Sequence, residues 1–155
     1  MTPQFREPIL AITAWLAGRS VEPSLTASLA EAFPPSGEVF QNLASACRAG
    51  MSDGWLGRRG EPGLRWGRPI KPGDETAGYS VDVVEMTSVA GPHHAHPQGE
   101  VGMIIPIDPG AKFDGHSEGW LVYGPGSAHS PTVTDGKAIV LYLLPGGEIA
   151  FTPPA

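Results

Sequence analysis

Three histidines and one glutamate, in two segments of the chain, have the types and spacing of a metal site. His94 and His96 are two residues apart, so on a strand both side chains project from the same face. Glu100 follows after the turn-forming Pro97-Gln98-Gly99, and His129 comes from a distant segment. Imidazole and carboxylate ligands together suit a divalent transition metal better than calcium or magnesium. We therefore predict a site for zinc, iron, manganese or nickel, and the spacing leaves the identity of the metal open.

Short strands separated by turns are expected to carry these side chains. The predicted strands, bounded by Gly, Pro and Asp turns, cover residues 64–69, 79–86, 101–107, 120–123, 138–144 and 148–151. Residues 101–107 alternate as in a half-buried strand, whereas residues 138–144 are apolar on both faces and predict a central strand. The pattern indicates a mainly β protein with an antiparallel sandwich or barrel.

The first 54 residues have a helical texture instead. Apolar residues at helical spacing predict a helix over about 7–17, and Ser24 is a plausible N-cap for a second helix that stops before Pro34. Ser36 and Gly50 are the expected N-cap and C-cap of a third helix. We predict that residues 1–54 form a helical arm, which packs on a β domain of residues 55–155 or on a partner subunit.

Composition limits the classes of function. The 155 residues suffice for one domain with a substantial core, since 41% of them are hydrophobic. The formal net charge is −6, which argues against binding to nucleic acid or to an anionic membrane. A single cysteine, Cys47, rules out an internal disulfide framework. No apolar run approaches the length of a membrane span and no signal-peptide layout opens the chain, so a cytoplasmic protein is expected.

Positive charge is concentrated in one part of this acidic chain. Five of the ten Lys and Arg residues fall within residues 58–71, together with Trp66. An arginine fork pairs with a carboxylate, and an indole offers a flat face to an aromatic ring. One interpretation is a pocket for an aromatic acid whose carboxylate is bound by Arg65 or by Arg68, with Arg68 preferred. The alternative is a solvated loop whose arginines pair with acidic side chains.

The metal-site segments resemble the two motifs of the cupin superfamily. Residues 94–100, His-Ala-His-Pro-Gln-Gly-Glu, match the first motif, and residues 126–129, Gly-Ser-Ala-His, match part of the second. Val133 departs from the pattern because it stands where an asparagine is expected. The resemblance implies a cupin-like antiparallel β-barrel, also called a double-stranded β-helix or jelly roll. The alternative to a metal site is a metal-free cupin pocket in which these polar side chains bond to one another.

A more specific resemblance is to the 4-hydroxylaminobenzoate lyases of bacterial nitroaromatic degradation. It rests on Gly67-Arg68 and on residues 91–100, 113–115, 119–123, 127–133 and 141–147. It implies conversion of 4-hydroxylaminobenzoate to 3,4-dihydroxybenzoate with release of ammonia. For this chemistry, a metal on His94, His96, Glu100 and His129 could bind the hydroxylamine oxygen. If no metal binds, Glu100 with a neighbouring histidine, His94 or His129, would serve as acid and base. Trp66 and either Trp120 or Tyr123 are expected to line the ring pocket, since strand alternation turns only one of the last two inward.

Two alternatives remain open at this point. One is an iron-dependent cupin dioxygenase that acts on an aromatic acid, and oxygen dependence would separate it from a lyase. The other is a cupin that binds an aromatic acid without catalysis. In each case the expected partner is a small aromatic acid, and the expected assembly is a homodimer.

Overall fold

The computed structural model describes residues 1–152, in which three helices precede the strands. The helices are α1 (Pro3–Leu16), α2 (Leu25–Ala32) and α3 (Glu38–Asp53), and a 3-10 turn covers Asp74–Thr76. The larger sheet has the order β1 (Arg59–Glu61), β2 (Leu64–Ile70), β3 (Tyr79–Thr87), β10 (Lys137–Pro145), β5 (Glu100–Pro106) and β7 (Gly119–Tyr123), and all its pairings are antiparallel. A second sheet contains β11 (Ala150–Phe151), β4 (His94–His96) and β8 (Ser127–His129), and β6 (Lys112–Phe113) pairs with β9 (Val133–Thr134).

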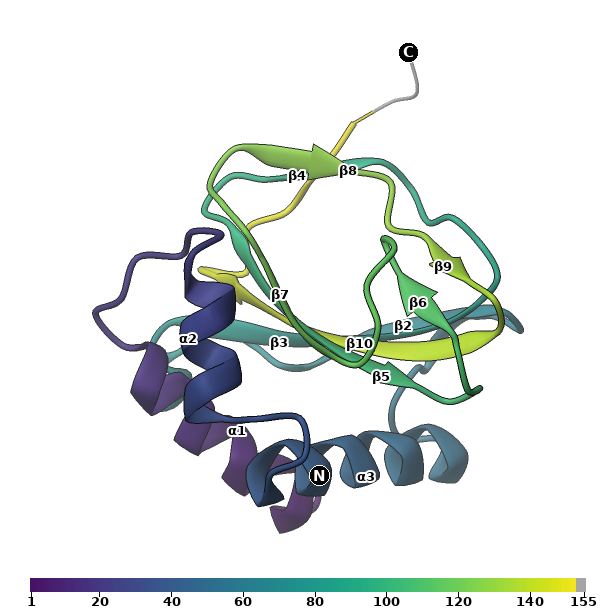
Figure 1. The fold of residues 1–155 in the computed structure, drawn as a ribbon, viewed down its shortest axis with the longest axis horizontal. Coiled ribbons are helices and arrows are strands. Elements are labelled where there is room, and N and C mark those ends of the chain that lie inside the picture. The colour runs from purple at the N-terminus through teal and green to yellow at the C-terminus, as the bar shows by residue number, and fades with distance from the viewer. Residues whose placement is uncertain (153–155) are drawn as a thin grey trace.

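The sheets face one another in a mainly β, cupin-like fold. In Figure 1 the strands β4 and β8 lie across from the six-stranded sheet, and the helices cover the other face of that sheet. The predicted mainly β, antiparallel fold with an N-terminal helical arm is confirmed. Among residues 1–152 the strands form three separately hydrogen-bonded sheets, so the barrel is open between them.

The helical arm shares one core with the outer face of the large sheet. Phe5 and Ile9 of α1 and Phe40 of α3 are fully buried, and they belong to the same apolar cluster as Val83 and Met103 of the sheet. Burying a side chain of this size contributes roughly 1.5–3 kcal/mol. The arm therefore covers the outer face of the six-stranded sheet, and the inner face of that sheet is left to form the site.

The ends of the helices differ from the sequence expectation. Helix α1 begins at Pro3 rather than near residue 7, and α3 has Gly37 rather than Ser36 at its N-cap. Helix α3 also runs past Gly50 to end before Gly54, which has a left-handed φ of 85°. Gly50 serves close packing instead, because a Cβ there would lie 2.6 Å from Leu56 Cδ1.

Strand β5 is buried on both faces, which corrects the half-buried interpretation of residues 101–107. Val101 and Met103 pack toward the helices, whereas Ile104 packs in the smaller cluster on the inner face. The smaller cluster is the reason, because Ile104 packs there with Phe113 of β6 and Val133 of β9 on the face that the alternation pattern leaves to solvent. The strands absent from the predicted ranges, β1, β4, β6, β8 and β9, are two or three residues long.

No helix in residues 1–152 has both the length and the apolar character required to span a lipid bilayer.

Candidate active site

Strand register brings the four predicted metal ligands together. His94 on β4 lies directly opposite His129 on β8, and His96 lies opposite Ser127. The turn after β4 then delivers Glu100 to the start of β5, with Gly99 at a φ of 87°. A side chain at this turn position would strain the backbone and meet a neighbouring carbonyl, so glycine is required there.

The donor atoms of these residues converge on one small region. The Nε2 atom of His94 lies 3.0 Å from that of His96 and 3.1 Å from that of His129. The carboxylate of Glu100 lies 3.4 Å from His96 Nε2. All four ligand atoms fall within 4.8 Å of one another, and the side chains are buried or nearly so. This arrangement is the one that the spacing of the two motifs predicts.

The outer ring nitrogens fix the protonation of the three histidines. His94 Nδ1 lies 3.1 Å from the Pro92 carbonyl oxygen, and His129 Nδ1 lies 2.6 Å from Asp114 Oδ2, so both nitrogens donate. Ser127 donates its only hydroxyl proton to the Gly124 carbonyl at 2.6 Å. Ser127 Oγ therefore accepts from His96 Nδ1, which lies 3.0 Å away.

With the Nδ1 atoms protonated, each neutral ring directs an Nε2 lone pair at the same region. Three lone pairs and a carboxylate repel one another unless a cation lies between them. Burial lowers the pKa of His94, and its histidine neighbours lower it further, so the ring favours the neutral form that binds a metal. The donor set fits a divalent transition metal.

Asp114 orients one of the ligands and was missed in the sequence prediction. Its Oδ2 accepts hydrogen bonds from His129 Nδ1 and from the Tyr123 hydroxyl, and its Oδ1 accepts from the Thr132 amide. Burial opposes ionisation of Asp114, but these three donors outweigh burial and lower its pKa. In the sequence, Asp114 is visible only as an acidic residue in a Phe-Asp-Gly turn. Its spacing from His129 does not predict that the two side chains meet.

Tyr123 and Trp120, the two alternative wall residues, project from opposite faces of β7. Tyr123 faces the site and stacks on His96 with ring centroids 5.5 Å apart. Trp120 faces the helices, where its Nε1 donates to the Phe33 carbonyl and its ring meets Phe40 edge-on. The predicted role of Trp120 in the ring pocket is corrected accordingly, because the side chain lies behind the sheet.

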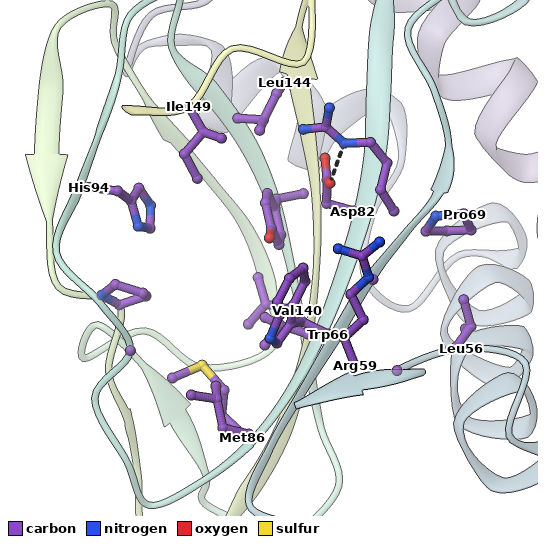
Figure 2. Close-up of a pocket in the computed structure, with 18 of the residues that line it drawn as sticks. Leu56, Arg59, Trp66, Pro69, Asp82, Met86, His94, Val140, Leu144 and Ile149 are labelled. Atoms are coloured by element: carbon purple, nitrogen blue, oxygen red, sulfur yellow. Dashed lines mark hydrogen bonds and ion pairs between the residues drawn. The ribbon is translucent and has the colours of Figure 1, made fainter. Parts of the chain in front are cut away.

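A cavity of about 1130 Å³ opens from the metal-site side chains. His94, Glu100 and His129 line one end of it, and Figure 2 shows His94 facing Trp66 and Val140 across the cavity. Its walls are mostly apolar, which suits a small ligand with an aromatic ring. They include Leu64, Trp66, Val84, Met86, Phe113, Val140, Leu144, Ile149 and Phe151.

The two predicted carboxylate-binding arginines already have acidic partners. Arg68 lines the cavity, but its Nε lies 2.7 Å from Asp82 Oδ1 and its Nη2 donates to the Gly147 carbonyl. The dashed line in Figure 2 marks its contact with Asp82. Arg65 donates to the Gly57 carbonyl, lies 3.9 Å from Glu85, and is absent from the cavity wall. The alternative interpretation, in which these arginines pair with acidic residues, thus describes their contacts.

Other cations line the cavity without such compensation. Arg58, Arg59 and Lys71 contribute to its wall, and none of them has an ion-pair partner among residues 1–152. The Arg59 guanidinium lies over the Trp66 ring, 5.4 Å from its centroid. Trp66 itself is 42% exposed at the cavity. Arg59 therefore places positive charge across the cavity from His94 (Figure 2).

This chain is similar in sequence to known proteins. The sequence model of the 4-hydroxylaminobenzoate lyase family matches residues 7–151. A 4-hydroxylaminobenzoate lyase from Nocardioides sp. (strain LMS-CY) is 34% identical over 90% of this chain and 89% of its own length. A protein of the same name from Pseudomonas putida is 32% identical over 79% of this chain and 80% of its own. A crystal structure of an RmlC-like cupin protein from Ralstonia eutropha JMP134 is 12% identical, covers 60% of this chain and 62% of that one, and superposes with a TM-score of 0.46.

Proposed function

Because this chain belongs to the 4-hydroxylaminobenzoate lyase family and is a lyase, we propose that it converts 4-hydroxylaminobenzoate to 3,4-dihydroxybenzoate and ammonia. The observation that carries the proposal is the family match over residues 7–151. The cavity agrees with it, since its wall carries both the metal-site donors and unpaired cations, with Arg59 across from His94 (Figure 2). A benzoate with a nitrogen substituent opposite its carboxylate has the matching polarity.

The proposed reaction balances without an oxidant. The N–O bond breaks and its electron pair leaves with oxygen, which takes up a proton and departs as water. A second water adds at the ring carbon beside the nitrogen-bearing carbon, and hydrolysis of the resulting imine releases ammonia. The sum is addition of one water to the substrate, so the enzyme must promote N–O cleavage and position water.

We assign the metal site to His94, His96, Glu100 and His129, whose donor atoms fit a divalent transition metal. Such an ion would supply Lewis acidity toward the hydroxylamino oxygen. Asp114 and Ser127 hold the rings of His129 and His96 in the metal-binding tautomer.

The remaining roles belong to the chain's own side chains. Glu100 lines the cavity, and in a site without a metal it would serve as acid and base together with His94 or His129. Trp66 packs against the ring. The substrate carboxylate lies among the cationic side chains of the cavity. Arg68 contributes there through the guanidinium hydrogens that do not bond to Asp82 or to the Gly147 carbonyl.

An anaerobic assay tests this proposal. The purified protein with 4-hydroxylaminobenzoate should yield ammonia and 3,4-dihydroxybenzoate in equal amounts without oxygen. A strict requirement for oxygen would instead favour the dioxygenase alternative. Binding of 4-hydroxylaminobenzoate with no product under any condition would favour the non-catalytic alternative.

We also propose a cytoplasmic homodimer that acts in nitroaromatic breakdown. A hydroxylaminobenzoate arises by reduction of a nitrobenzoate, so an enzyme that consumes it follows such a reduction. Light scattering of the purified protein should give twice the mass of the 155-residue chain. A monomer mass would contradict the dimer without affecting the assigned reaction.

A further inference from the structure

Tyr142 is the only polar side chain in the apolar run of residues 138–144, and its position was not singled out by sequence. It lies in the middle of the large sheet, opposite Asp82 on β3 and opposite Gly102 on β5. Paired residues in a sheet project from the same face, so Tyr142 shares the inner face with Asp82. Its side chain lines the cavity.

The neighbour on β5 leaves room for the phenol ring. Gly102 carries no side chain, and the next residue on its face of β5 is Glu100. Diagonal cross-strand neighbours of this kind lie within reach of an aromatic side chain. Tyr142 therefore lies on the cavity wall beside the metal-site carboxylate.

The hydroxyl of Tyr142 has no hydrogen-bond partner within residues 1–152. Asp82, the residue opposite, has both oxygens engaged: Oδ1 accepts from Arg68 and Oδ2 accepts from Ser80, each at 2.7 Å. Every fully buried side-chain polar atom among these residues has a hydrogen-bond partner. Because the Tyr142 hydroxyl has none, it is not fully buried and must reach the open cavity. A phenylalanine would pack equally well, and the hydroxyl thus points to a ligand contact.

The charges around Tyr142 determine which kind of ligand atom its hydroxyl can bind. Burial raises the pKa of Tyr142, and the carboxylates of Asp82 and Glu100 raise it further. The phenol therefore keeps its proton at neutral pH and acts as a hydrogen-bond donor, not as a base. A donor here suits an oxygen on which negative charge develops.

We infer that Tyr142 donates a hydrogen bond to the hydroxylamino oxygen of the substrate, and that this hydrogen bond becomes stronger as the N–O bond breaks. The inference rests on the proposed function. Tyr142 keeps its own proton throughout, and the proton that completes the departing water is the one released by the water that adds to the ring. The residue is therefore catalytic by contact with the leaving oxygen.

The test compares two tyrosine-to-phenylalanine variants. Tyr142→Phe removes only the hydroxyl, and Tyr79→Phe makes the same change on the helix-covered face of the sheet. Loss of a hydrogen bond to an oxygen that gains charge in the transition state should lower kcat of Tyr142→Phe at least about tenfold. KM should change much less, and Tyr79→Phe should retain the wild-type kcat.

A second probe separates this role from a structural one. 4-Aminobenzoate lacks the hydroxylamino oxygen, so its inhibition constant should be the same for wild type and Tyr142→Phe. An inhibition constant that rises as much as kcat falls would overturn the inference, because the hydroxyl would then serve packing. A wild-type kcat in Tyr142→Phe would also overturn it while the proposed function stands. No turnover by the wild-type protein would overturn both.

Discussion

Substitution of Asp114 by asparagine perturbs the metal site through a single atom. Asp114 has a φ of 48°, a conformation that asparagine also adopts, so the backbone of the turn should be retained. The amide oxygen can still accept from the Thr132 amide. The amide nitrogen, however, would replace the oxygen that now accepts from His129 Nδ1 and from Tyr123.

Two donors would then face each other at His129. The imidazole can relieve this conflict by moving its proton to Nε2, the nitrogen that lies 3.1 Å from His94 Nε2. A proton there must leave before a metal can bind. Changes to such outer partners reduce metal affinity by about 10–100-fold, or about 1.4–2.7 kcal/mol. We therefore expect Asp114→Asn to bind zinc at least tenfold more weakly.

Competition with a chromophoric chelator at fixed pH measures this affinity. Tyr123→Phe is the matched control, since it removes the other bond to Asp114 Oδ2 while keeping the ring that stacks on His96. Its zinc affinity should stay close to that of the wild type. A folded Asp114→Asn with undiminished zinc affinity would refute the reasoning, as would equal losses in both variants.

Three other variants probe the scaffold. Arg68→Ala should lower the free energy of unfolding by about 1–3 kcal/mol at pH 8, because it strips the buried Asp82 carboxylate of its charged partner. Burial already raises the pKa of Asp82, and loss of Arg68 raises it further, so the folded variant binds this proton more tightly than the unfolded chain. The loss of stability measured by denaturation should therefore become smaller as the pH is lowered from 8. Deletion of residues 1–50 should give aggregated protein, because it uncovers the apolar outer face of the sheet, and a soluble, fully active truncation would contradict this. Gly50→Ala should destabilise the fold by about 1–3 kcal/mol in urea despite better helix propensity, since its Cβ would overlap buried Leu56.

Much of the metal site could be predicted because its information is local. The spacing of His94, His96 and Glu100 already specifies one strand face and one turn, and β4–β8 register adds His129. Asp114 and Tyr142 could not be found this way. Their roles depend on which strands or turns become neighbours, and neither position has a partner nearby in sequence.

The same distinction explains the corrections. Arg68 looked available because its partner, Asp82, lies on the next strand rather than in the same segment. Trp120 looked like a wall residue because the alternation of β7 does not say which face turns toward the cavity. Strand β5 looked half-buried because its pattern carries no information about β6 and β9, which cover its inner face.

Restoration of metal to chelator-treated wild-type protein is the most direct test of a metal-assisted lyase at this site. Anaerobic formation of 3,4-dihydroxybenzoate is measured while zinc, iron, manganese or nickel is added in steps. We expect the rate with the active metal to rise in proportion to bound ion and to level off at one ion per chain, as the single cluster His94, His96, Glu100 and His129 requires. A full rate in protein free of metal, or a rate that does not follow the bound ion, would contradict the account.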